Sequence, residues 1–180
     1  HVLACDGRYR GVDSALNMEK VCIDLGNAVR HAKEKLGYRH VVLLGWSGGG
    51  SLSAFYQSQA ENPTVTCSPC GAGPDLTKQD FIAADGLILM AAHVSRHGTL
   101  TQWIDASITD ETDPERRDPA LDLYGEDIKP PYTQAFLERY RIAQIARNRK
   151  ITAWVKHKLQ ELADKGRENE EFAFVTHGTM

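Results

Sequence analysis

The sequence lacks the features that mark several large classes of protein. It contains no apolar run near the roughly 20 residues needed to span a bilayer. Its first ten residues have the pattern of a short strand and a polar turn, which is not that of a signal peptide. With 21 basic and 24 acidic residues, the net charge of -3 gives no support for binding to nucleic acid or to a membrane surface. We therefore expect a cytoplasmic protein that binds neither.

Cysteine is also scarce, since four cysteines in 180 residues do not make a disulfide framework. Cys67 and Cys70 have C-x-x-C spacing, but zinc would need a second pair of ligands, and the sequence has no second C-x-x-C or H-x-x-H. A redox pair usually opens a helix after a strand, whereas this pair lies in a Pro/Gly-rich stretch. We expect a plain surface loop here, and neither a metal nor a cofactor.

What the sequence does contain is the composition of one globular domain, with 42% hydrophobic and 25% charged residues. Apolar runs predict strands, and apolar residues at three- and four-residue steps predict helices. The expected strands are 1–5, 40–45, 85–92 and 172–176; the expected helices are 17–36, 48–60 and a long helical region over 132–166, which we divide into two. This alternation predicts an α/β fold with a mostly parallel sheet. The inner strands do not alternate, so they are expected to be covered on both faces.

One short motif carries chemistry. Residues 45–49 (GWSGG) fit G-x-S-x-G and stand between a predicted strand and a predicted helix. In that setting the serine, Ser47, sits on a sharp strained turn that exposes its hydroxyl, and Gly45 and Gly49 are small because the chain passes close to itself. The N–H of Gly48 would form half of an oxyanion hole. The motif therefore predicts Ser47 as a catalytic nucleophile.

Two phosphate-binding motifs that also contain glycine-rich turns fit these residues less well. A phosphate-binding Walker loop needs Lys before its final Ser, but Gly50 precedes Ser51. The order of glycines also breaks the dinucleotide-binding fingerprint. An incidental serine in a glycine-rich turn is the remaining alternative.

At these residues the chain resembles the α/β-hydrolase family. VVLLGWSGGG is similar to the family's fifth strand and nucleophile elbow, DGLILMAA to its sixth strand, and FAFVTHG to its seventh; residues 5–11 look like the turn after its fourth strand. The resemblance implies a partial α/β-hydrolase sheet flanked by helices. Residues 1–92 would form the core, 93–170 a helical cap, and 171–180 a returning core strand.

The resemblance also implies that parts of the catalytic machinery lie outside these 180 residues. The family's triad acid follows strand seven and its histidine comes later, but Gly178 to Met180 end the chain. We therefore expect an internal piece of a longer hydrolase that lacks the acid, the base and the second oxyanion donor. Its unpaired sheet edges would favour a homodimer or poor solubility.

A triad built from the residues present would be unorthodox. His177 or His93 could act as base, with Asp105 or Asp110 as acid, whereas Asp85 starts its strand and lies at the wrong end. The plainer expectation is that His177 shapes a loop and that His93 lines the substrate pocket.

These observations predict a serine hydrolase that acts on a small-molecule ester or another acyl bond through Ser47. Trp46 and His93 are the expected substrate-binding residues. The acidic stretch 105–118 is expected to be a solvated loop, and Arg147, Arg149 and Lys150 the solvent face of the cap helix. The alternative is a non-catalytic binding protein with an α/β-hydrolase-like fold, which Ser47-dependent ester turnover would rule out.

Overall fold

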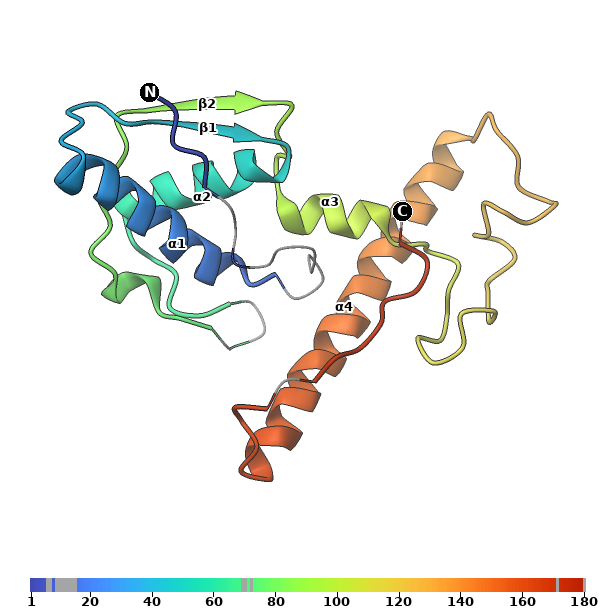
Figure 1. The fold of residues 1–180 in the computed structure, drawn as a ribbon. Helices are drawn as coiled ribbons and strands as arrows, with labels where there is room; N and C mark the ends of the chain where they lie inside the picture. The colour runs from blue at the N-terminus through green and yellow to red at the C-terminus, as the bar shows by residue number, and fades with distance from the viewer. Residues whose placement is uncertain (6–7, 9–15, 69–70, 72, 171, 180) are drawn as a thin grey trace. The chain divides into compact units, whose positions relative to one another are not determined.

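A computed structural model describes the chain except for residues 6–7, 9–15, 69–70, 72, 171 and 180 (Figure 1). Within it the chain divides into two compact units, residues 1–96 and 97–180. Its elements are α-helices and one sheet of two parallel strands, so the predicted α/β character is confirmed. Each unit is described by itself.

Unit 1 begins its regular structure with the predicted helix over 17–36. Helix α1 (Met18–Arg30) opens where the side chain of Asn17 accepts a hydrogen bond of 2.9 Å from the backbone N–H of Lys20. The chain continues without a break as a single turn of π-helix, η2 (His31–Lys35). The helix ends before Gly37, whose φ of 73° is the left-handed conformation that closes many helices.

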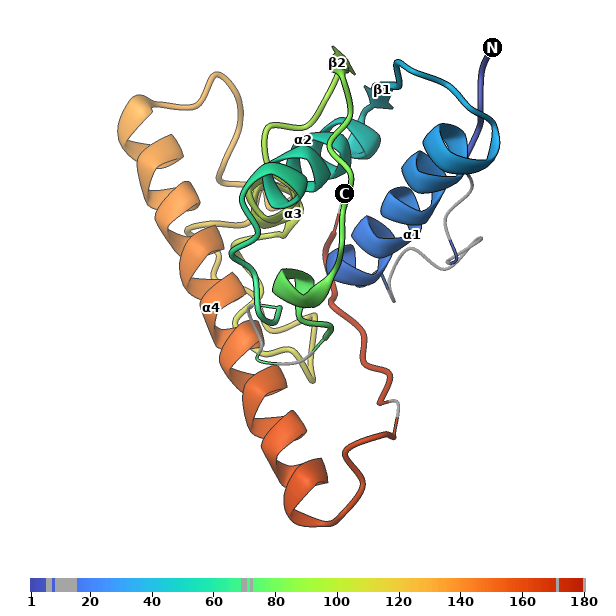
Figure 2. The ribbon, with the colours of Figure 1, turned by 90° about the vertical axis from the view of Figure 1, so that its left-hand side faces the viewer.

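The sheet consists of β1 (Val42–Trp46) and β2 (Gly86–Met90), which pair in parallel from Val42 opposite Gly86 to Trp46 opposite Met90. Helix α2 (Gly48–Glu61) leaves directly from the end of β1. The two strands and this helix therefore form where the sequence predicts them. Figures 1 and 2 show that α1 and α2 lie on the same face of the sheet.

The core of unit 1 lies between those two helices and the sheet. Tyr56 of α2 is fully buried there, and its hydroxyl donates a 2.7 Å hydrogen bond to the carbonyl of Ile82. Gly26 lets α1 come close to Phe81, because a Cβ at that position would lie 2.7 Å from the Phe81 ring. The buried residues of this cluster are Cys22, Val29, Leu43, Tyr56, Leu76 and Ala84. Leu76 reaches it from the short 3-10 helix η3 (Leu76–Lys78).

The opposite face of the sheet is exposed, so the prediction that the inner strands are covered on both faces is wrong. Val42, Leu44 and Trp46 are 54%, 59% and 68% exposed, while Leu43 between them is buried. The reason is that both helices of unit 1 pack on one face. A continuous apolar run does not distinguish a strand covered twice from one whose second face is open.

Two predicted strands are absent from the described residues. Residues 1–5 have no regular structure and are exposed. Residues 172–177 also form no strand, because Phe172 and Phe174 pack on Trp154 of the neighbouring helix instead, with ring centroids 6.1 and 5.1 Å away. The predicted domain boundaries at 92 and 170 stay a prediction.

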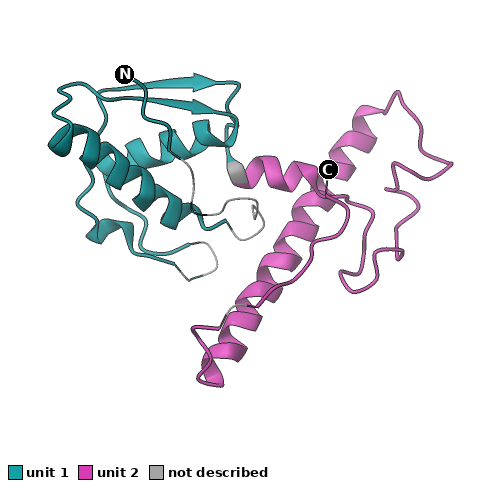
Figure 3. Ribbon diagram, in the orientation of Figure 1, with its two compact units in different colours: residues 1–96 teal, residues 97–180 magenta. Residues whose placement is uncertain are grey.

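The described residues of unit 2 form two helices, shown in magenta in Figure 3 apart from the first residue of α3. The first, α3 (Arg96–Trp103), lies outside the three helical ranges predicted above; it is short and contains Gly98 and two threonines, so it carries little helical signal. The second, α4 (Gln134–Asp164), is one helix of 31 residues, not two, because no Gly or Pro interrupts it. Among the helices described, not even α4 combines the length and the apolar character that a membrane crossing requires.

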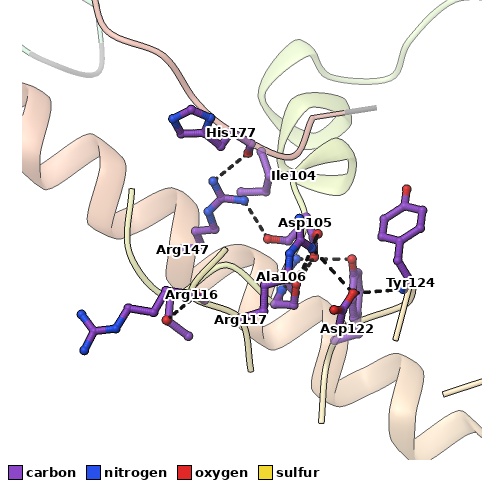
Figure 4. A network of polar contacts seen from close by, with 12 residues as sticks. Ile104, Asp105, Ala106, Arg116, Arg117, Asp122, Tyr124, Arg147 and His177 are labelled. Carbon is purple, nitrogen blue, oxygen red and sulfur yellow. Dashed lines mark hydrogen bonds and ion pairs between the residues drawn. The ribbon is translucent and has the colours of Figure 1, made fainter. Parts of the chain in front are cut away.

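A buried arginine links α4 to the irregular segments of unit 2. Arg147 is only 4% exposed, so its predicted place on the solvent face is wrong, whereas Arg149 and Lys150 are exposed as expected. Its Nε and Nη2 each donate a 2.7 Å hydrogen bond to Glu111. Its Nη1 donates to the carbonyl of Asp105 at 2.7 Å, and Nη2 also to that of His177 at 2.8 Å (Figure 4). An i, i+3 pattern cannot reveal these partners, since they are 30 to 42 residues away in sequence.

Asp105 belongs to the same network and is not part of a solvated loop. Its side chain accepts from the backbone N–H and the hydroxyl of Ser107 at 2.9 and 2.8 Å, and it pairs with Arg117 at 2.6 Å. Burial raises the pKa of this carboxyl, but the hydrogen bonds from Ser107 and Arg117 outweigh it and leave the pKa below its ordinary value. The stretch therefore folds around a buried, charged Asp105.

We expect Arg147→Met to destabilise the chain by about 2–4 kcal/mol, because it leaves the Asp105 and His177 carbonyls and the Glu111 carboxylate without their donor. Arg149→Met is the matched control on the exposed face of α4, and it should change the free energy of unfolding by less than about 0.5 kcal/mol. Urea unfolding of both variants measures this. Equal effects of the two substitutions would mean that the Arg147 network does not hold unit 2 together.

Candidate active site

Ser47 stands at the turn between β1 and α2 in a backbone conformation that few residues adopt. Its φ and ψ are 53° and -121°. A positive φ in a residue other than glycine costs about 1–3 kcal/mol and persists only where the surroundings enforce it. Three hydrogen bonds do so: the Ser47 N–H donates to the Met90 carbonyl at 3.0 Å, and the Ser47 carbonyl accepts from Gly50 at 3.1 Å and from His93 at 3.1 Å. The end of β2, the start of α2 and the segment after β2 therefore hold this residue in place.

Close backbone packing at the turn requires glycine at two positions. A Cβ on Gly45 would lie 2.4 Å from the Gly49 carbonyl oxygen and 2.6 Å from the Gly50 Cα, so Gly45 is needed as predicted. A Cβ on Gly50 would lie 2.2 Å from the Cβ of Ala92. Gly49 itself has open space around it, so the expectation that it must be small is wrong. The crowded glycine after the turn is Gly50, because the first turn of α2 brings this residue, and not Gly49, against Ala92 just after β2.

The side chain that meets the Ser47 hydroxyl is that of His93. The Ser47 Oγ and the His93 Nε2 are 3.3 Å apart. His93 is third after the end of β2, and Ala91 between them has a positive φ of 42° that turns the chain at this point. Because the carboxyl ends of parallel strands meet at one edge of a sheet, β1 delivers the serine and β2 the histidine to the same place.

A hydrogen-bond donor for negative charge also lies at this turn. Gly48 is the first residue of α2, and the first N–H groups of a helix have no acceptor within it. The helix N-terminus adds a partial positive charge at the same point. Ser47, Gly48 and His93 are each partly exposed. The arrangement can therefore present a hydroxyl, a nitrogen base and an N–H donor to a small molecule.

Trp46, a predicted substrate-binding residue, stands directly before Ser47. Along β1 it belongs to the same face as Val42 and Leu44, opposite to the buried Leu43. It therefore points to the open face of the sheet, where it is 68% exposed. Its role as a substrate-binding residue stays a prediction.

The other residues of the unorthodox triad lie in unit 2. Asp105 is held in the Arg117 network, and Asp110 pairs with Arg116 at 3.1 Å. His177 takes part in unit 2 through its backbone carbonyl, which accepts from Arg147. Of the four candidate triad residues, His93 is the one whose ring contacts the Ser47 hydroxyl.

Asp85, the carboxylate expected at the wrong end of its strand, stands one residue before β2. It accepts from the Val41 N–H at 2.8 Å and pairs with Lys33 at 3.0 Å. The hydrogen bond from Val41 and the ammonium group of Lys33 lower the pKa of its carboxyl. It therefore fixes the end of the sheet opposite to Ser47.

Cys22 does not compete with Ser47 as a nucleophile. Cys22 is fully buried, and burial together with the nearby Glu19 raises the pKa of its thiol to about 12, which suppresses the reactive thiolate. Cys67 is exposed. Its C-x-x-C partner Cys70 lies outside the described residues.

Two features of the site go beyond what the sequence predicts. The sequence offers His93 as a possible base for Ser47 but favours a pocket-lining role for it, and the G-x-S-x-G motif does not mark Gly50 as a crowded position. For Gly50 the signal is Ala92, the small residue that ends the predicted strand over 85–92, since its Cβ would lie 2.2 Å from a Cβ at position 50.

Comparison of the chain with protein-family models, with curated proteins and with solved structures finds no match in any of the three.

We expect Gly45→Ala to destabilise unit 1 by about 2 kcal/mol or more, because its new methyl group would overlap the backbone of Gly49 and Gly50. Gly49→Ala is the matched control, since its methyl group meets open space; it should be neutral or slightly stabilising. Urea unfolding gives both values. If Gly45→Ala were as stable as Gly49→Ala, the backbone of this turn could not be as tightly packed as described.

Proposed function

We propose that this protein is a serine hydrolase of the α/β-hydrolase type that cleaves an ester or another acyl bond. The observation that carries the proposal is the strained backbone of Ser47 at the junction of a parallel strand and a helix. Proteins retain such strain where it serves a purpose, and a nucleophile raised above the end of a sheet is one such purpose.

The reaction follows from the groups around the hydroxyl. As the Ser47 Oγ forms a bond to the carbonyl carbon of the substrate, the π electrons of that carbonyl move to its oxygen and the hydroxyl proton passes to a base. The Gly48 N–H donates a hydrogen bond to the resulting oxyanion. Collapse of this intermediate expels the alcohol, which takes up the proton, and water then hydrolyses the acyl-serine.

The test is turnover of p-nitrophenyl esters with acetyl, butyryl and octanoyl groups. We expect slow hydrolysis by the chain and a loss of about 10³-fold or more in Ser47→Ala, because the acyl intermediate forms on this hydroxyl. Ser58→Ala is the control, since this serine lies exposed on α2, away from the turn. Turnover that survives in Ser47→Ala would contradict the proposal. Absence of turnover with all three esters would favour a binding protein.

A further inference from the structure

We infer that His93 is the general base that takes the proton from Ser47, an inference that rests on the function proposed above. It replaces the expectation that a histidine outside these residues does so. The inference rests on the observation that His93 contacts Ser47 twice, once through its backbone N–H and once through its imidazole ring.

The two contacts fix the histidine relative to the hydroxyl. The His93 backbone N–H donates to the Ser47 carbonyl at 3.1 Å, while the His93 Nε2 lies 3.3 Å from the Ser47 Oγ. The ring distance is slightly longer than the 2.6–3.2 Å of a tight catalytic hydrogen bond, as is common before a substrate binds. Because the backbone contact joins the same two residues, the ring remains within reach of the hydroxyl.

The strand pairing explains why this histidine is the one in place. The Ser47 N–H donates to the Met90 carbonyl, which continues the β1–β2 ladder by one step beyond the strands. The positive φ of Ala91 then redirects the chain, so that His93 returns toward the serine. His40, by contrast, precedes β1 at the far end of the sheet and is 81% exposed.

The chemistry needs one tautomer of the ring. With its hydrogen on Nδ1, the imidazole accepts the Ser47 hydroxyl hydrogen at Nε2. When the Oγ–carbon bond forms, the O–H bond breaks and the proton moves to Nε2, which gives an imidazolium ion beside the oxyanion. That proton then passes from Nε2 to the leaving alcohol oxygen as its bond to the carbonyl carbon breaks.

The experiment follows the labelling of the full chain by an alkyl fluorophosphonate, with intact mass measured over time. In this reaction the Ser47 Oγ bonds to phosphorus, fluoride leaves, and the proton goes to the base. We expect one adduct on the unmodified protein and none on Ser47→Ala. His93→Ala should be labelled about 100-fold more slowly or worse, which is the usual worth of a general base. His40→Ala should be labelled at the original rate.

Two further measurements separate a base from a residue that only positions the hydroxyl. His93→Gln keeps an oxygen that can accept a hydrogen bond but cannot take up a proton, so we expect it to be as slow as His93→Ala. Free imidazole should restore part of the labelling of His93→Ala and leave that of His93→Gln slow, because the glutamine fills the space. Circular dichroism of each variant verifies that it is folded.

Three results would overturn the inference. Labelling of His93→Ala at the original rate would remove His93 as the base, although the adduct on Ser47 would leave the proposed hydrolase intact. Rapid labelling of His93→Gln would reduce His93 to a positioning role. Absence of any adduct on the unmodified chain would contradict both the inference and the proposed function for this chain.

Discussion

The packing of the chain around Ser47 is the constraint on which the rest of the site depends. Three backbone hydrogen bonds keep this residue at a φ of 53°, and the absence of side chains at Gly45 and Gly50 lets strand, helix and the segment after β2 converge there. A conformation that costs about 1–3 kcal/mol is thus held by groups from three separate segments. The same convergence brings His93 to the hydroxyl and opens α2 with the Gly48 N–H beside it.

Local patterns in the sequence predict the elements that build this turn. The predicted helix over 17–36 forms, with Asn17 capping its start and Gly37 following its end in the structure, and GWSGG marks the passage from β1 to α2. These signals succeed because capping, left-handed glycines and a sharp strand-to-helix turn are set by neighbouring residues. The parallel pairing of β1 and β2 follows from the helix between them.

Features that depend on distant partners could not be predicted in this way. Phe172 and Phe174 have the composition of a strand but pack on Trp154, and Arg147 has the spacing of an exposed residue but is buried against distant segments. Likewise, the contact between Ser47 and His93 joins residues 46 positions apart. Periodicity gives the face on which a residue stands and says nothing of what covers that face. The exposed face of the sheet at Val42, Leu44 and Trp46 illustrates the same point.

If Ser47 attacks an acyl group as proposed, the turn must also bind the oxyanion that results. A crystal structure of the chain after reaction with an alkyl fluorophosphonate would show both properties at once. We predict phosphorus bonded to the Ser47 Oγ, a positive φ at Ser47, and a phosphonyl oxygen about 3 Å from the Gly48 nitrogen. An adduct on another side chain, or a phosphonyl oxygen directed away from Gly48, would contradict this prediction.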